Sequence, residues 1–124
     1  MIQPYLHFNG NCEEAFNFYA ECFDGKVVCL SRLNNDPNNP VMHSQVQLTE
    51  SGGSVSGGDT NEPVKISGME ILVFLPREKI ENIAGKLSVG GTLVSGFTPH
   101  PPPDDTGGGA VVLDKYGYTW FLCA

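Results

Sequence analysis

Two histidines and one glutamate lie in or at the start of predicted strands, where their side chains could do chemistry. His7 and His43 each lie in a stretch of strand-like composition, and Glu70 lies at the start of a third. Two imidazoles and a carboxylate are a common ligand set for a transition-metal ion. A carboxylate can also act as a general base, and apolar surroundings would suit Glu70 to that role. We therefore take Glu70 as candidate base or ligand and His43 as its catalytic partner.

The position of His7 within its strand makes it a weaker candidate. Successive side chains of a strand point to opposite faces. His7 stands between Leu6 and Phe8, so we expect it on the other face from them, as an ordinary core or surface histidine. His43 begins a strand that could line a binding site, so it stays a candidate for touching a ligand.

A second group of possible metal ligands occurs in the loop at residues 99–109. His100, Asp104 and Asp105 are close in sequence, but three consecutive prolines separate the histidine from the acids. Consecutive prolines hold the chain extended. A solvated loop is therefore the favoured interpretation, and the role of this segment stays open.

Length and composition limit the class of protein. With 124 residues, 40% of them hydrophobic, the chain is long enough for one domain with its own core. A formal charge of −7 argues against a nucleic-acid partner, since phosphate binding needs clustered cations. The acidity either serves solubility or favours a cationic ligand.

Cysteine spacing and hydropathy suggest the compartment. The four cysteines lack the close pairing of a zinc knuckle or a redox dithiol, so we expect buried free thiols. No apolar run is long enough for a membrane span, and no signal-peptide pattern opens the chain. The expected location is the cytoplasm, without membrane contact.

The elements that must position these residues follow from periodicity and turn residues. Residues 2–8 read as a buried strand, and a helix is expected from about Cys12, with Asn11 as N-cap and Glu14 reaching back to it. Asp24 and Gly25 end that helix. The remaining predicted elements are strands at 26–33, 41–49 and 54–56, a loop at 57–68, a strand at 69–75, a helix beginning at Pro76, and strands at 92–97, 110–113 and 118–123.

The two halves of the chain repeat one plan. Sliding the first half by 66 positions matches apolar residues and turn glycines, in the pairs Leu6–Leu72, Phe8–Phe74, Gly25–Gly91 and Val28–Val94. The sequence therefore predicts a single α+β domain of two βαβββ modules, one at about residues 1–58 and the other at about 69–124.

The opening segment PYLHFNGNCEEAFNFYAECFDGKVV and the closing segment DKYGYTWFLCA make the pattern more specific. With the duplicated βαβββ plan, they resemble the vicinal oxygen chelate superfamily, in particular its PhnB-like branch related to glyoxalases, bleomycin-resistance proteins and extradiol dioxygenases. The resemblance implies a curved mixed sheet that encloses a ligand cup. It also implies that two-chain assemblies are common.

Metal-dependent members of that superfamily hold a divalent ion with His or Glu from four strand positions. By resemblance, these positions fall on Pro4, on Glu70, on Phe121 and near Val55 or Ser56. Only Glu70 offers a suitable donor, and one carboxylate does not hold such an ion tightly. We therefore expect no metal and no other cofactor.

Strand residues of the two modules are expected to form an apolar wall of the cup. The candidates for ligand contact are Leu6, Phe8, Leu72, Phe74 and Phe121. The predicted function is metal-free binding of a small molecule, cationic or amphiphilic, by a homodimer. An enzyme with a relocated or absent metal, of lyase, isomerase or dioxygenase type, is the alternative, and a protein that acts only through dimerisation or a partner surface is a third.

Overall fold

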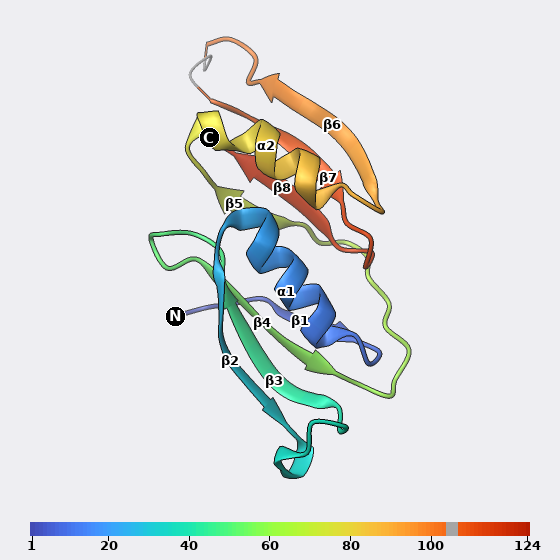
Figure 1. The fold of residues 1–124 in the computed structure, drawn as a ribbon. Helices are drawn as coiled ribbons and strands as arrows, with labels where there is room; N and C mark the ends of the chain where they lie inside the picture. The colour runs from blue at the N-terminus through green and yellow to red at the C-terminus, as the bar shows by residue number, and fades with distance from the viewer. Residues whose placement is uncertain (104–106) are drawn as a thin grey trace. The chain divides into compact units, whose positions relative to one another are not determined.

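A computed structural model describes residues 1–103 and 107–124 of the chain. These separate into two compact units, Met1–Lys65 and Ile66–Ala124. Each unit consists of a strand, a helix and three further strands, and the helix lies across one face of its own sheet (Figure 1). The predicted fold class, α+β with two βαβββ modules, is confirmed.

The first unit, called unit 1 below, is built on a mixed four-stranded sheet. Its elements are β1 (Tyr5–Phe8), α1 (Cys12–Phe23), β2 (Lys26–Arg32), a 3₁₀ turn η1 (Leu33–Asn35), β3 (Val41–Gln47) and β4 (Ser54–Asp59). The strand order is β1-β4-β3-β2. The β1–β4 pair is parallel and the other two pairs are antiparallel.

The second unit, unit 2, repeats this topology. Its elements are β5 (Ile71–Phe74), α2 (Arg77–Leu87), β6 (Thr92–Pro99), β7 (Gly108–Leu113) and β8 (Thr119–Cys123). The strand order β5-β8-β7-β6, with β5 and β8 parallel, matches that of unit 1 strand for strand. No helix in the described part of the chain is long and apolar enough to cross a membrane.

Each unit buries the apolar stripe of its helix against one face of its sheet. In unit 1 the ring of Phe8 meets that of Phe16 edge-on, with centroids 5.8 Å apart, and both side chains are buried. In unit 2 the fully buried side chains of Ile80 and Leu87 on α2 lie over the sheet that carries Trp120. Burial of each such side chain contributes about 1.5–3 kcal/mol, which makes this face the stable core of its unit.

The start of α1 differs from the prediction. Asn11 makes no side-chain cap hydrogen bond, so its predicted capping role is wrong. Instead, Asp59 Oδ1 at the end of β4 accepts the backbone N–H groups of Gly10 and Cys12, each at 3.0 Å. Asp59 Oδ2 accepts the backbone N–H of Val41 at 2.9 Å. A carboxylate 47 residues away from Cys12 in the sequence thus satisfies the helix terminus.

Strand β4 is longer than predicted because two glycines belong to the strand and not to a loop. A Cβ at Gly57 would lie 2.8 Å from Phe16 Cζ, and one at Gly58 would lie 2.8 Å from the Tyr5 hydroxyl oxygen. Strand glycines often mark such close approach of a neighbour. The Gly-rich composition at this point reflects tight packing on both faces of the sheet.

The repeat is also offset by one residue from the predicted register. The buried residues of β1 are Leu6 and Phe8, and those of β5 are Ile71 and Val73, a spacing of 65 rather than 66. The predicted spacing of 66 holds beyond the helices, where a Cβ at Gly25 or at Gly91 would collide with the backbone of the adjacent strand end. The turn between α2 and β6 is two residues longer than the turn between α1 and β2, and α2 is one residue shorter than α1, so the net shift is one residue.

Three cysteines are buried as predicted: Cys12, Cys22 and Cys123. The prediction is wrong for Cys29, which is exposed on β2.

Candidate functional site

The face of the unit 1 sheet turned away from α1 gathers polar and aromatic side chains. We call it the open face of unit 1 and define it by Tyr5, His7, Ser31, His43, Gln45 and Ser56. These residues share a face because of the strand register. Tyr5 pairs with Ser56, which pairs with Gln45, and His43 pairs with Ser31.

Within this face, both strand histidines contact the Tyr5 ring. The ring centroids of Tyr5 and His7 are 5.2 Å apart at an interplanar angle of 54°, and those of Tyr5 and His43 are 6.0 Å apart at 24°. His7 pairs with Gly58, and because Gly57 pairs with Ser44, the next step along the antiparallel pair sets Gly58 beside His43. The missing side chain at Gly58 leaves the space that the Tyr5 hydroxyl occupies.

Hydrogen bonds fix the neighbours of the histidines. The Tyr5 hydroxyl donates to the backbone oxygen of Met42 at 3.1 Å. Partial burial, and then the nearby Cys12 sulfur at the high pH where it can ionise, raise the pKa of Tyr5, so the phenol stays protonated at neutral pH. The Ser56 hydroxyl donates to Gln3 Oε1 at 2.7 Å. The result is an uncharged aromatic platform with hydrogen-bonding groups around it.

The corresponding face of the unit 2 sheet carries a row of apolar side chains. We call it the open face of unit 2 and define it by Leu72, Phe74, Val111 and Phe121. Leu72 pairs with Phe121, which pairs with Val111, so one row of apolar side chains crosses three strands. Leu72 is 52% exposed and Phe74 is 69% exposed. Two sheets of the same topology thus present open faces of different character, polar and aromatic in unit 1 and mainly apolar in unit 2.

The structure divides the five predicted ligand contacts between two kinds of environment. Leu72, Phe74 and Phe121 lie together on the open face of unit 2. Leu6 and Phe8 lie under α1, 1% and 3% exposed, on the opposite side of β1 from Tyr5 and His7. Their predicted role in ligand contact remains a prediction, but in this position they serve the core.

The two predicted catalytic residues belong to different units. His43 lies on β3 of unit 1, and Glu70 directly precedes β5 in unit 2, where it is exposed. Since Leu72 is two residues further along, strand alternation puts Glu70 on the side of the open face of unit 2.

The donor set at the positions taken from metal-using relatives does not fit a divalent ion. Pro4 and Phe121 have no donor, Val55 is buried, and the Ser56 hydroxyl is bonded to Gln3. In the ranges 1–103 and 107–124, no three His, Cys, Asp or Glu side chains are grouped as a metal site requires. Of the loop cluster considered from the sequence, Asp104 and Asp105 lie outside the described residues.

Sequence reasoning missed two features of unit 1. One is Tyr5, whose spacing of two residues from His7 could have placed both on one face. The other is a pocket of about 460 Å³ beside the start of α1, lined by Asn9, Pro40, Asp59, Asn61 and Glu62 among others. Its residues come from three separate loops and strand ends, so no local sequence pattern predicts it.

No family model matches the sequence, and no curated protein matches it. Several solved structures do match it. The protein PA1353 from Pseudomonas aeruginosa is 24% identical with a TM-score of 0.80, over 98% of this chain and 95% of that one. A PhnB protein from Bacillus cereus is 27% identical with a TM-score of 0.74, over 98% and 96%.

A glyoxylase/bleomycin resistance protein/dioxygenase domain from Frankia is 11% identical with a TM-score of 0.72, over 99% of this chain and 94% of that one. The fold is that of the vicinal oxygen chelate superfamily. The resemblance seen in the sequence, including that to PhnB-like proteins, is therefore confirmed.

Proposed function

We propose that this protein binds a small molecule without the help of a metal ion, on the open faces of its two sheets. The observation that supports this proposal best is the exposed apolar row on unit 2. Leu72 and Phe74 are more than half exposed although their strand neighbours Ile71 and Val73 are buried. Soluble proteins rarely leave a contiguous apolar patch uncovered without a role for it.

Each open face is a candidate binding surface within its own unit. The open face of unit 2 offers apolar contact, and that of unit 1 offers imidazole, phenol, amide and hydroxyl groups. Binding sites commonly combine a mainly apolar lining with a few polar groups that orient the ligand. The cup and the homodimer implied by the family resemblance are part of this proposal.

A matched pair of variants tests the proposal. Leu72→Gln replaces an apolar side chain of the open face of unit 2, and Val89→Gln replaces a similarly exposed one, 63% exposed, outside the sheet. Removal of a Leu side chain from a ligand contact costs about 1.5–3 kcal/mol, or a factor of about 10 to 100 in affinity. A thermal-shift screen of neutral, cationic and anionic amphiphiles finds the ligands, and calorimetry measures them.

We expect Leu72→Gln to weaken binding by at least about tenfold and Val89→Gln to leave it unchanged. Equal affinities for both variants and the wild type would contradict the proposal. Light scattering on the same samples tests the homodimer, which should give twice the chain mass.

Catalysis remains the alternative proposal, with Glu70 as base or ligand and His43 as its partner. It requires chemistry that Glu70→Gln abolishes while ligand affinity is retained, because the amide keeps the shape of the side chain but cannot take up a proton at neutral pH. This alternative fails if the wild type converts none of the ligands found in the screen. It also fails if Glu70→Gln still converts those that the wild type converts.

A further inference from the structure

The charges of unit 1 are sorted between its surfaces. Its sequence carries eight acidic residues against three basic ones. The acids lie on α1 and at its end (Glu13, Glu14, Glu21, Asp24), in turns (Asp36, Glu50) and at or beyond the end of β4 (Asp59, Glu62). None of the residues that define the open face of unit 1 is acidic, so the net charge of the chain does not describe this face.

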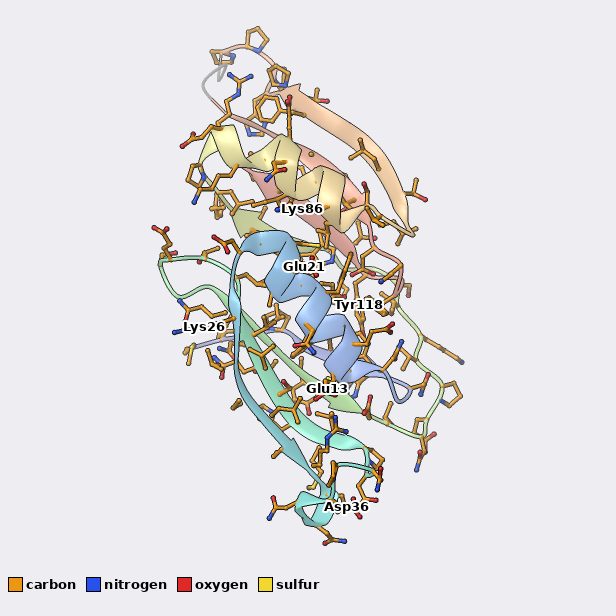
Figure 2. All side chains as sticks on the ribbon, viewed as in Figure 1. Glu13, Glu21, Lys26, Asp36, Lys86 and Tyr118 are labelled. Atoms are coloured by element: carbon orange, nitrogen blue, oxygen red, sulfur yellow. The ribbon has the colours of Figure 1, made fainter. Side chains whose placement is uncertain are left out.

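The groups on this side of the sheet that can become positively charged are two imidazoles and a lysine ammonium. Among the described residues there, the only groups that can become negatively charged are a phenol and a thiol, which are weak acids. Protonation of His7 and His43 would add two positive charges beside Tyr5. Lys26 pairs with Gln47 at the far end of β2, on the same side of the sheet as Gln45. Figure 2 shows Lys26 at the start of β2, with Glu13 and Glu21 on α1.

The aromatic platform adds a preference for a flat ligand. Tyr5 is 45% exposed and is held in place by its hydrogen bond to the backbone of Met42. Aromatic rings pack favourably at centroid distances of about 4.5–7 Å, the range in which both imidazoles already lie from Tyr5. The His43 ring is stacked on Tyr5 and the His7 ring is tilted to it, so a planar ring that packs on Tyr5 would meet aromatic neighbours and no acidic side chain.

We propose that the open face of unit 1 binds a planar aromatic acid. The ring packs on Tyr5 and its two flanking imidazoles, and the carboxylate accepts a hydrogen bond from His7 or His43. This inference rests on the proposed function and narrows its ligand class. It replaces the cationic ligand suggested by the net charge, because a cation would meet no carboxylate on this face and would be repelled by protonated histidines.

The pH dependence has a definite sign. An exposed imidazole ordinarily gains its proton between about pH 8 and pH 5.5, whereas an aromatic carboxylate stays ionised. Facing the imidazoles are the Tyr5 phenol on β1 and the Cys29 thiol on β2, with the Lys26 ammonium further along β2. Affinity for the acid should therefore rise as the pH falls.

Three probes that share one ring system test the proposal on the full-length protein: 2-naphthoate, 2-naphthalenemethanol and 2-naphthylmethylammonium. Calorimetry should rank the naphthoate first and the ammonium last. The affinity of the protein for the naphthoate should rise about tenfold from pH 8 to pH 5.5, which is the contribution of about one charge-assisted hydrogen bond. The double variant His7→Gln/His43→Gln should lose this rise, and His100→Gln, in unit 2, should keep it. Tyr5→Leu should weaken all three probes by a similar factor.

Equal affinity for naphthoate and ammonium, or a rise at low pH that survives the double variant, would overturn the inference. Circular dichroism and thermal unfolding check that each variant is folded. If the alcohol binds with the expected dependence on Leu72 while the naphthoate gains nothing at low pH, this inference fails and the proposed function stands. If no probe and no screened amphiphile binds, both fail.

Discussion

The carboxylate of Asp59 joins three segments of unit 1 that are distant in sequence. It accepts the backbone N–H groups of Gly10 and Cys12 at the start of α1 and that of Val41 at the start of β3. We predict that its removal destabilises unit 1 more than removal of any other exposed or half-buried acid there.

The magnitude follows from the three hydrogen bonds. A hydrogen bond to a charged group contributes about 1.5–3 kcal/mol, and water can replace part of it at a half-buried site. Asp59→Ala should therefore cost about 3–5 kcal/mol of unfolding free energy, including the loss of the helix cap. Asp59→Asn keeps an acceptor for the helix start but turns an NH₂ group toward the Val41 N–H, which should cost about 1.5–3 kcal/mol.

Urea unfolding followed by circular dichroism measures these losses, with the m-value as a check on two-state behaviour. Hydrogen exchange gives a local readout, since the amides of Gly10 and Cys12 should exchange faster in both variants. The matched control is Asp36→Ala, which removes a carboxylate that accepts one backbone N–H, from Asn38, in an exposed turn. This control should cost less than about 1 kcal/mol.

The reasoning would be refuted if Asp59→Ala cost no more than Asp36→Ala. It would also fail if Asp59→Asn were as stable as the wild type, because the hydrogen bond to Val41 would then contribute nothing.

Three further predictions concern packing and ionisation. Gly57→Ala should cost more than about 2 kcal/mol because its Cβ meets backbone and a buried ring, whereas Gly85→Ala, with open space around it in α2, should gain about 0.5–1 kcal/mol; thermal unfolding of both decides. Burial, and then the nearby carboxylate at the end of β4, raise the pKa of Cys12 to about 12 from an ordinary value of 9.0. The folded state therefore keeps its full stability below about pH 9, where this thiol is protonated in both the folded and the unfolded chain. It loses stability as the pH rises from about 9 towards 12, because only the unfolded chain then releases the proton readily. At about pH 10 the wild type should have lost about 1.4 kcal/mol more than Cys12→Ala, and in native labelling at about pH 8, followed by mass spectrometry, Cys29 should react while Cys12 does not. Asp114→Asn should cost about 2–4 kcal/mol in urea unfolding, since the buried carboxylate accepts two backbone N–H groups and an indole N–H; a smaller loss would mean that an amide satisfies them.

Much of the fold could be predicted because its signals are local. The helix stripe beginning at Cys12, the turn at Gly25 and the closing hairpin all follow from periodicity and turn residues, and the structure confirms them. The strand at residues 54–56 was predicted too short because glycine normally weakens a strand, and the reason for Gly57 and Gly58 lies in the residues packed against them from other strands and from α1.

Which residue belongs to which face was harder to predict. Alternation separates His7 from Leu6 and Phe8 in the sequence, but it does not say which side the helix covers. That choice decides whether a residue joins the core or the open face. The repeat predicted the wrong register for the first strand of unit 2, because the segment from α2 to β6 has a net excess of one residue over the segment from α1 to β2.

By itself, the sequence determined the duplicated βαβββ plan, since hydrophobic period and turn chemistry are properties of neighbouring residues. Only the tertiary structure decided that Asp59 caps α1, that Tyr5 contacts both His7 and His43, and that no acid is among the residues of that face. These features depend on strand pairing between residues about 40 to 50 positions apart, and pairing at that distance is set by packing of the whole unit and not by any local pattern.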